Sequence, residues 1–242
     1  MINLLLWLLT YTAYADSSIL IDSTSYLYGN VKFRHNELYI TSKIAIVSPD
    51  KVTARDSVSI LKGDFEILTD FGEYFWNKEI KLYNGFVAYG KYETFTGREG
   101  RYFEDKLWVT DSIKYVNTNE NWVVSGQQGF YDIQTHFAMI TDSPKFEAIQ
   151  DSIYVVGDTI KLFKDTLTKV IHNTIVKLSG IQCFAESLIY LPKVEQVLLY
   201  GNPIIVSEVD SLKGVQMKIM LSDKKIDRIL VEGKVWGRRW KI

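Results

Sequence analysis

The fold of this chain is decided by the stretch Gly100-Arg101-Tyr102-Phe103-Glu104-Asp105-Lys106-Leu107-Trp108-Val109-Thr110-Asp111. It places a small residue two positions before a large one, followed by an acidic turn, a second apolar run and a polar break. Because side chains alternate across a strand, Gly100 and Tyr102 lie on the same face of the sheet. The stretch therefore predicts two strands that are joined by a hairpin turn and end at a corner.

The same small-x-large motif recurs roughly every 28 residues along the chain. Self-similarity at a fixed period predicts a repeat architecture, in which each unit buries its apolar face against its neighbours. In the middle copies, we expect the glycine to leave space that the large residue two positions later fills. The copies are Ala45-Ile46-Val47, Gly72-Glu73-Tyr74, Gly100-Arg101-Tyr102, Gly129-Phe130-Tyr131, Ile160-Lys161-Leu162, Leu188-Ile189-Tyr190 and Met217-Lys218-Ile219.

Two kinds of break separate the apolar runs, which are short, alternating and rich in β-branched or aromatic residues, as half-buried strands are. Hairpin turns are predicted at Asn77-Lys78, Glu104-Asp105, Asn117-Thr118-Asn119, Pro192-Lys193 and Ser222-Asp223-Lys224. Corners are predicted at Gly29-Asn30, Asn84-Gly85, Thr110-Asp111, Thr141-Asp142 and Gly201-Asn202. The chain is thus predicted to be all-β, with about seven two-strand repeats. Residues 164–173 interrupt the pattern and are predicted to be a longer loop or a joint.

Composition narrows the class of protein. Hydrophobic residues make up 47% of the chain and aromatic residues 14%, with only four prolines, which favours an ordered, strand-rich protein. The formal net charge is −1, and the 28 basic and 29 acidic residues are interspersed. Binding to nucleic acid needs clustered Lys and Arg, so this balance argues against it.

The N-terminus predicts export. Leu4-Leu5-Leu6-Trp7-Leu8-Leu9 is a short apolar run, and Ala13-Tyr14-Ala15 has the small-x-small pattern of a cleavage site. The run is too short to span a bilayer, so residues 1–15 are predicted to be a signal peptide that precedes one domain over residues 16–242. Because the segment Met1-Ile2-Asn3 has no Lys or Arg, an uncleaved anchor is the alternative.

The sequence offers little for catalysis. Its single cysteine, Cys183, excludes an intramolecular disulfide and is predicted to be a small buried residue. The histidines His35, His136 and His172 fall at different phases of the repeat and are predicted to be surface strand or turn residues rather than metal ligands. Carboxylates are scattered, and no nucleophile elbow or phosphate loop is present. The sequence therefore predicts a protein that is not an enzyme, with no metal and no cofactor.

Trp76, Trp108 and Trp122 could stack on sugars, as in a lectin. Their repeat phases differ, which favours mixed core and edge packing. What remains is a long apolar lining, which suits an elongated hydrophobic ligand.

Register, strand content and export signal together resemble the OstA-like family, the LptA-type periplasmic proteins of lipopolysaccharide transport. Three segments carry the resemblance, in the order and spacing of the family. They are Gly29-Asn30-Val31-Lys32-Phe33 with Leu38-Tyr39-Ile40-Thr41-Ser42-Lys43-Ile44-Ala45, then Phe184-Ala185-Glu186-Ser187-Leu188-Ile189-Tyr190 with Leu198-Leu199-Tyr200-Gly201-Asn202-Pro203-Ile204-Ile205, and Lys225-Ile226-Asp227-Arg228-Ile229-Leu230-Val231-Glu232-Gly233. The family's Asp is Lys43 in the first segment, and Gly replaces Ala in the middle copies, which leaves the family branch open.

The resemblance implies an OstA-type β-jellyroll, in which two antiparallel sheets form an open V around an apolar groove. The groove would shelter the acyl chains of lipopolysaccharide or a lipid A-like glycolipid in the periplasm, without catalysis. Edge strands would pair with other jellyroll components of the export machinery, or with further copies of this chain. The residues expected to line the groove are Ile40, Ile67, Tyr74, Tyr102, Tyr131, Leu162, Tyr190 and Ile219.

Three alternatives remain open. A structural or adhesive β-repeat protein of the cell surface would have a closed, dry core. A secreted carbohydrate-active enzyme would need two carboxylates in one cleft. An LptC-type membrane-anchored receptor would retain the N-terminal segment.

Overall fold

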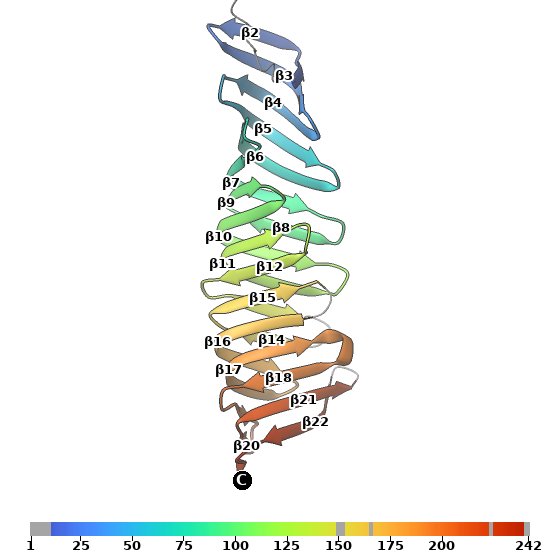
Figure 1. Ribbon diagram of the computed structural model, residues 1–242, viewed down its shortest axis with the longest axis vertical. Helices are drawn as coiled ribbons and strands as arrows, with labels where there is room; N and C mark the ends of the chain where they lie inside the picture. The colour runs from blue at the N-terminus through green and yellow to red at the C-terminus, as the bar shows by residue number, and fades with distance from the viewer. Residues whose placement is uncertain (1–10, 149–152, 165–166, 223–224, 240–242) are drawn as a thin grey trace, which may run out of the picture. The chain divides into compact units, whose positions relative to one another are not determined.

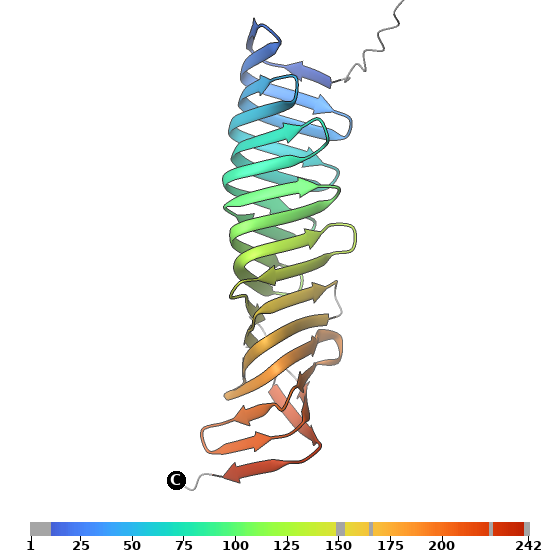
Figure 2. The same ribbon diagram turned by 60° about the vertical axis from the view of Figure 1, so that its left-hand side comes forward.

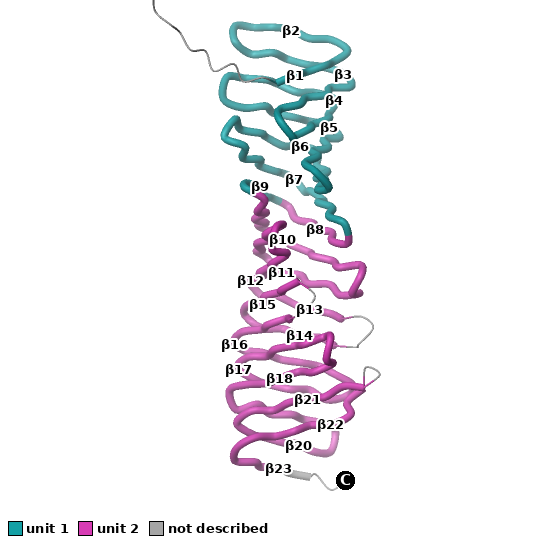
Figure 3. The backbone as a smooth tube through the Cα atoms, turned by 45° about the vertical axis from the view of Figure 1, so that its right-hand side comes forward, with its two compact units in different colours: residues 1–91, 99–104 teal, residues 92–98, 105–242 magenta. Residues whose placement is uncertain are grey.

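The computed structural model describes residues 11–148, 153–164, 167–222 and 225–239. The chain divides into two compact units, which are coloured separately in Figure 3. Unit 1 comprises residues 1–91 and 99–104, and unit 2 comprises residues 92–98 and 105–242. Residues 1–10 of the predicted signal peptide lie outside the described residues, and its last part contains the strand β1.

Unit 1 is built from antiparallel strands only, among its described residues. Each long strand is a rung that pairs with the next one along the chain (Figure 1). The strands are β1 (Tyr11–Tyr14), β2 (Ser17–Ile21), β3 (Thr24–His35), β4 (Leu38–Val47), β5 (Lys51–Lys62), β6 (Phe65–Phe75), β7 (Ile80–Tyr89) and β9 (Glu99–Phe103).

Unit 2 follows the same plan, with one short 3-10 turn, η1 (Pro192–Val194), among its described residues (Figure 2). Its first strands are β8 (Glu93–Gly97), β10 (Lys106–Asn117), β11 (Trp122–Asp132), β12 (Phe137–Thr141), β13 (Lys145–Ala148), β14 (Ile153–Val156) and β15 (Thr159–Phe163). The rest are β16 (Leu167–Leu178), β17 (Ile181–Leu191), β18 (Gln196–Tyr200), β19 (Ile204–Val206), β20 (Asp210–Lys213), β21 (Gln216–Ser222), β22 (Lys225–Glu232) and β23 (Trp236–Arg239). The predicted all-β fold of antiparallel strands is confirmed.

Corners divide the long strands into two halves. At Asp56-Ser57 and Asp111-Ser112, two successive residues have positive φ, and the pairing register shifts there. Asn, Asp and Gly tolerate this left-handed conformation better than other residues, so short polar pairs mark the corners. All five predicted corners have positive φ; they are Gly29-Asn30, Asn84-Gly85, Thr110-Asp111, Thr141-Asp142 and Gly201-Asn202.

Because of the corners, each unit contains two stacks of half-strands. We call stack B the one that carries the small-x-large motifs, and stack A the other. In unit 1, residues 31–35 of β3 belong to stack A and residues 25–28 to stack B. In unit 2, residues 113–117 of β10 belong to stack A and residues 106–110 to stack B. The predicted pair of antiparallel sheets thus corresponds to two stacks in each unit.

The hairpin turns lie at the ends of the half-strands that are farthest from the corners. Lys78 adopts positive φ in the turn between β6 and β7, and Glu104 and Asp105 each do so after β9. Asn117 accepts a backbone N–H of its turn from Glu120. These predicted turns are confirmed; residues 223–224 of the last one lie outside the described residues. We call the side of a unit where the turn ends of its two stacks approach each other the mouth.

One predicted irregularity is wrong. Residues 167–173 are not a loop or a joint, because β16 begins at Leu167 and pairs with β15 and β17. The polar Thr168 that interrupts the apolar pattern is itself buried. The break lies further along, at His172-Asn173, where positive φ forms a corner.

The glycines of the motif make room for neighbouring rungs rather than for the tyrosine that follows them. A Cβ on Gly129 would come within 2.2 Å of Ile113 Cδ1, and one on Gly100 within 2.7 Å of Phe86 Cε1. At Gly72 the nearest atoms would be 3.6 Å away, an ordinary contact. The expected role of the glycines is thus corrected at Gly100 and Gly129, where the neighbouring strand rather than the next large residue requires a glycine; at Gly72 the space does not require one.

Candidate functional site

All eight residues predicted to line a groove are buried in the interior between the two stacks. Ile40 and Ile67 lie on stack A of unit 1. The other six are large residues of the motif and lie on stack B of their own unit. Their inward position follows from the alternation of side chains across a strand. Contact with a ligand stays a prediction for each of them.

The motif tyrosines face phenylalanines of stack A, which the sequence analysis did not single out. Each phenylalanine is buried and lies on a strand about one and a half repeats earlier in the chain. Such aromatic pairs add about 0.5–1.5 kcal/mol beyond the burial of their surface. The number of residues between Phe and Tyr differs from pair to pair, so a search at one fixed spacing would not have found them all. Ring centroids are 6.3 Å apart for Phe33–Tyr74, 5.9 Å for Phe65–Tyr102, 4.3 Å for Phe95–Tyr131 and 6.3 Å for Phe146–Tyr190.

Three of these tyrosines also form hydrogen bonds across the mouth. The hydroxyl of Tyr74 lies 2.6 Å from His35 Nδ1, and Lys62 Nζ donates to the hydroxyl of Tyr102 over 3.3 Å. The hydroxyl of Tyr131 donates to Glu93 Oε2 over 2.6 Å. The partners are 39, 40 and 38 residues apart in the chain. We call these three contacts the tyrosine clasps; they join the turn ends of stack A to stack B.

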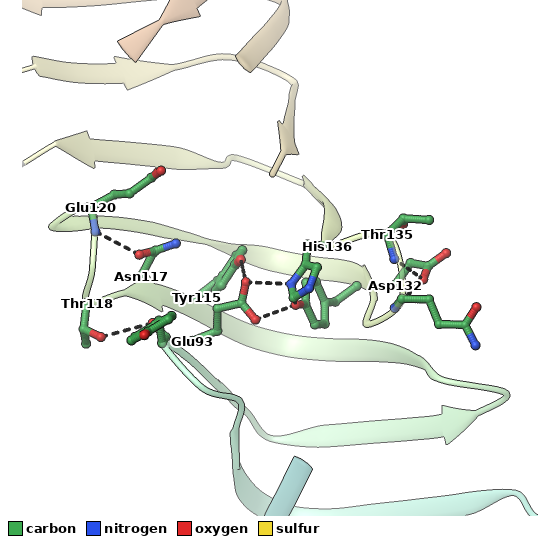
Figure 4. A network of polar contacts seen from close by, with 11 residues as sticks. Glu93, Tyr115, Asn117, Thr118, Glu120, Asp132, Thr135 and His136 are labelled. Atoms are coloured by element: carbon green, nitrogen blue, oxygen red, sulfur yellow. Dashed lines mark hydrogen bonds and ion pairs between the residues drawn. The ribbon is translucent and has the colours of Figure 1, made fainter. Parts of the chain in front are cut away.

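The clasp at Glu93 is the most elaborate (Figure 4). Besides Tyr131, Tyr115 donates to Glu93 Oε1 over 3.3 Å, and His136 Nδ1 lies 3.2 Å from the same oxygen. His136 Nδ1 is also 3.0 Å from the Tyr131 hydroxyl. Burial, and then the hydrogen bond to Glu93, raise the pKa of Tyr131, so this phenol remains a donor. Several donors around one carboxylate make this clasp stronger than a neutral hydrogen bond.

His35 is not a surface residue, contrary to the prediction for the histidines. It is buried at the end of β3, and the amide nitrogen of Asn36 lies 3.3 Å from its Nε2. If Asn36 donates to Nε2, then Nδ1–H donates to the Tyr74 hydroxyl, and one neutral tautomer satisfies both contacts. Burial, and then the charge of Lys78, lower the pKa of His35, while burial raises that of Tyr74 to about 12. The aromatic neighbours explain why the residue is inside.

Trp76 lies at the same mouth and has an unusual feature. Its indole Nε1 is buried without a hydrogen-bond partner in the described part of the chain. The ring packs against Phe33, His35 and Tyr74 at centroid distances of 6.0, 5.7 and 5.9 Å. The ring of Tyr11 in β1 stacks on the Trp76 ring, with the two centroids 5.6 Å apart. A buried donor without an acceptor costs about 1–3 kcal/mol, so the mouth of unit 1 holds an unfavourable group.

The other two tryptophans combine core and edge packing, as predicted. Trp108 lies 5.5 Å from Phe130, and Trp122 packs on Tyr115 and donates through Nε1 to Glu120. All three tryptophans are half-buried.

Cys183 is buried, as predicted, and burial raises the pKa of its thiol to about 12. His172 is exposed at a corner. Among the described residues, no group of three or more His, Cys, Asp or Glu side chains could hold a metal ion.

An open pocket of about 460 Å³ lies near the C-terminal strands of unit 2. It contains none of the eight predicted lining residues. Its lining is Asn202, Lys213, Gly214, Val215, Lys234 and Trp236.

In the described part of the chain, no helix is both long and apolar enough to cross a membrane. No protein-family model matches the chain, and no curated protein matches it. One similar solved structure is that of LptH from Pseudomonas aeruginosa, described as the LptA-homologous periplasmic component of the lipopolysaccharide transport device. Its sequence is 15% identical, and the match covers 55% of this chain and 83% of that chain with a TM-score of 0.25. Likeness at this level does not establish a family, so the fold of this chain rests on the strand pairing described above.

Proposed function

We propose that this chain is a periplasmic lipid-transport protein that shelters the acyl chains of lipopolysaccharide, or of a lipid A-like glycolipid, between its two stacks. The observation that carries the proposal is the burial of the large residue in all seven motif copies. A repeated apolar lining suits a long aliphatic ligand, because each CH₂ removed from water contributes about 0.8 kcal/mol. The sequence resemblance to the OstA-like family and the predicted signal peptide support the same function.

Edge strands at the two ends of the chain support pairing with other jellyrolls. In the described part of the chain, β2 pairs with β3 alone and β22 with β21 alone, so each has a free edge. β2 also exposes large apolar side chains, and Leu20 is 71% exposed. Free, apolar strand edges recruit further strands. We therefore propose that partners of the export machinery, or further copies of this chain, add at these edges.

A photoreactive residue placed on β9 or β11 tests the lipid proposal. Photo-crosslinking in cells should attach lipid at position 102 or 131, where the tyrosines face the interior. Arg101 is the matched control, because it is exposed and lies next to Tyr102 on the same strand. Adducts at position 101 but at neither interior position would contradict the proposal.

A structural β-repeat protein with a dry core is the second candidate function. The observation that favours it is the close filling of the interior, where Phe33, Phe95 and Phe146 are at most 1% exposed. This candidate predicts no lipid adduct at any position. It also predicts an unchanged lipopolysaccharide level at the cell surface when the protein is depleted, whereas a transport protein predicts a fall.

A further inference from the structure

The interior has to make room before it can hold a ligand. The phenylalanine–tyrosine pairs span it, and Phe95 and Tyr131 are at most 2% exposed. Cores are packed as densely as organic crystals and leave few voids larger than a water molecule. An acyl chain can therefore enter between the stacks only if the stacks move apart.

The two sides of each unit differ in how strongly they resist such a movement. At a corner, the backbone passes from one stack into the other, so the stacks cannot separate there without breaking the pairing of each rung. At the mouth, the described contacts between the stacks are made by side chains only. A hydrogen bond between side chains contributes about 0.5–1.5 kcal/mol, or 1.5–3 when one group is charged. The mouth is thus the weaker side.

A second observation, in unit 1, points to the same side. The unpartnered indole Nε1 of Trp76 lies at the mouth, beside the clasp of His35 and Tyr74. Parting the stacks there would give this donor an acceptor from water or from the polar part of a ligand. In the chain that retains Tyr11, the closed mouth therefore holds a donor that gains a hydrogen bond when the mouth opens.

We infer that ligand enters and leaves sideways through the mouth, with the corners as hinges, and that the tyrosine clasps set how readily the mouth opens. This inference rests on the proposed lipid-binding function. It adds the route of the ligand and the residues that control it. The strongest clasp is that of Glu93 with Tyr131 and His136 in unit 2, where Tyr115, which is on the same stack as Glu93, also donates to the carboxylate (Figure 4).

Distances between spin labels on unit 2 test the movement in the full chain. Cys183 is replaced by Ala, so that only introduced thiols are labelled. Asn119→Cys and Gln134→Cys place labels on exposed turns of stack A and stack B, on the two sides of the mouth. Ser112→Cys and Gln127→Cys form the control pair, because both are exposed on neighbouring rungs at one corner.

Detergent-dispersed diphosphoryl lipid A is the probe. Its addition should shift the distances across the mouth to longer values and leave the corner pair unchanged. If lipid A binds, as a direct binding assay measures, and the mouth distances stay the same, the entry route is wrong although the proposed function survives. If lipid A does not bind, the proposed function fails. The role of the clasps is then tested in the lipid-free chain.

Tyr131→Phe removes the hydroxyl that donates to Glu93 and keeps the ring. In the absence of lipid, it should raise the population with long mouth distances about tenfold, since the lost bond involves a charged group. Tyr83→Phe is the matched control, because Tyr83 donates to Glu73 over 3.1 Å within stack B of unit 1. If Tyr131→Phe leaves the population with long mouth distances unchanged, the inference is wrong.

Discussion

The corners and the mouth of each unit hold the two stacks together by opposite means. At the corners, the backbone itself turns, and short polar residues supply the positive φ that the turn needs, as at Asp56-Ser57 and Asp111-Ser112. At the mouth, phenylalanine–tyrosine pairs and tyrosine clasps bridge two separate strands. The shape of the rung is thus a local property of the chain. Closure of the rung is a property of residues far apart in sequence.

The largest loss of stability should come from the removal of an aromatic residue at the mouth. Phe95→Ala removes a fully buried ring that lies 4.1 Å from Tyr115 and 4.3 Å from Tyr131. It should lower the free energy of unfolding by about 3–5 kcal/mol, as measured by urea denaturation. Phe95→Leu, which keeps most of the volume, is the control and should lose less. Equal losses in the two variants would mean that packing at the mouth contributes little.

Glycine at a corner should have the next largest effect, through the backbone alone. Gly85 has φ of +100°, and a Cβ there would meet no atom within 4 Å. Gly85→Ala should therefore cost about 1–2 kcal/mol from the strained conformation only. Gly72→Ala is the matched control on stack B, where the nearest atoms would be 3.6 Å away. If Gly85→Ala lowers the free energy of unfolding no more than Gly72→Ala does, the corners do not depend on residues that tolerate positive φ.

A smaller effect is expected from acid at the mouth of unit 1. Because the pKa of His35 is lowered in the folded chain, the unfolded chain binds a proton first as the pH falls below about 6.5. The stability that His35 contributes is complete above this pH and is lost as the pH falls towards the lowered pKa. The free energy of unfolding, measured from pH 7.5 to 5, should fall less steeply in His35→Gln.

His172→Gln provides the control for this pH dependence, because His172 is exposed at a corner. It should keep the slope of the wild-type chain. If His35→Gln also keeps that slope, the buried histidine at the mouth is not the group responsible.

The smallest effect is expected for an exposed ion pair at a corner. Arg98 donates to Asp111 over 3.2 Å, but the two side chains are 71% and 48% exposed. Such pairs contribute about 0–1 kcal/mol. Arg98→Ala should thus change the midpoint of urea unfolding very little, whereas a clear loss would show that the corners also depend on side-chain contacts.

Much of the fold could be predicted from local sequence. The corners at Asn84-Gly85 and Gly201-Asn202 were identifiable because few residue types tolerate positive φ. The inward position of the motif residues followed from the two-residue alternation of a strand. The prediction of a loop or joint was wrong for residues 167–173, because a buried Thr168 resembles a break in the apolar pattern. Its burial depends on neighbouring strands, which a local pattern does not contain.

The candidate site was predicted only in part, for the same reason. The burial of His35 is set by Tyr74 of β6 and by Trp76 in the turn after β6, both of which are distant from β3 in the chain. The pairing of Phe95 with Tyr131, and of Glu93 with both Tyr131 and His136, joins residues about one and a half repeats apart. No rule of spacing within one strand identifies such partners.

Local sequence is sufficient to set the strands, their corners and the face on which each motif residue lies. These properties depend on the conformational preferences of single residues and on the geometry of one strand. Tertiary structure alone decided which residues meet across the mouth, and so which hydroxyl groups hold it closed. That choice depends on how two stacks pack against each other, because the contacts join rungs that are distant in the chain and adjacent only in the folded unit.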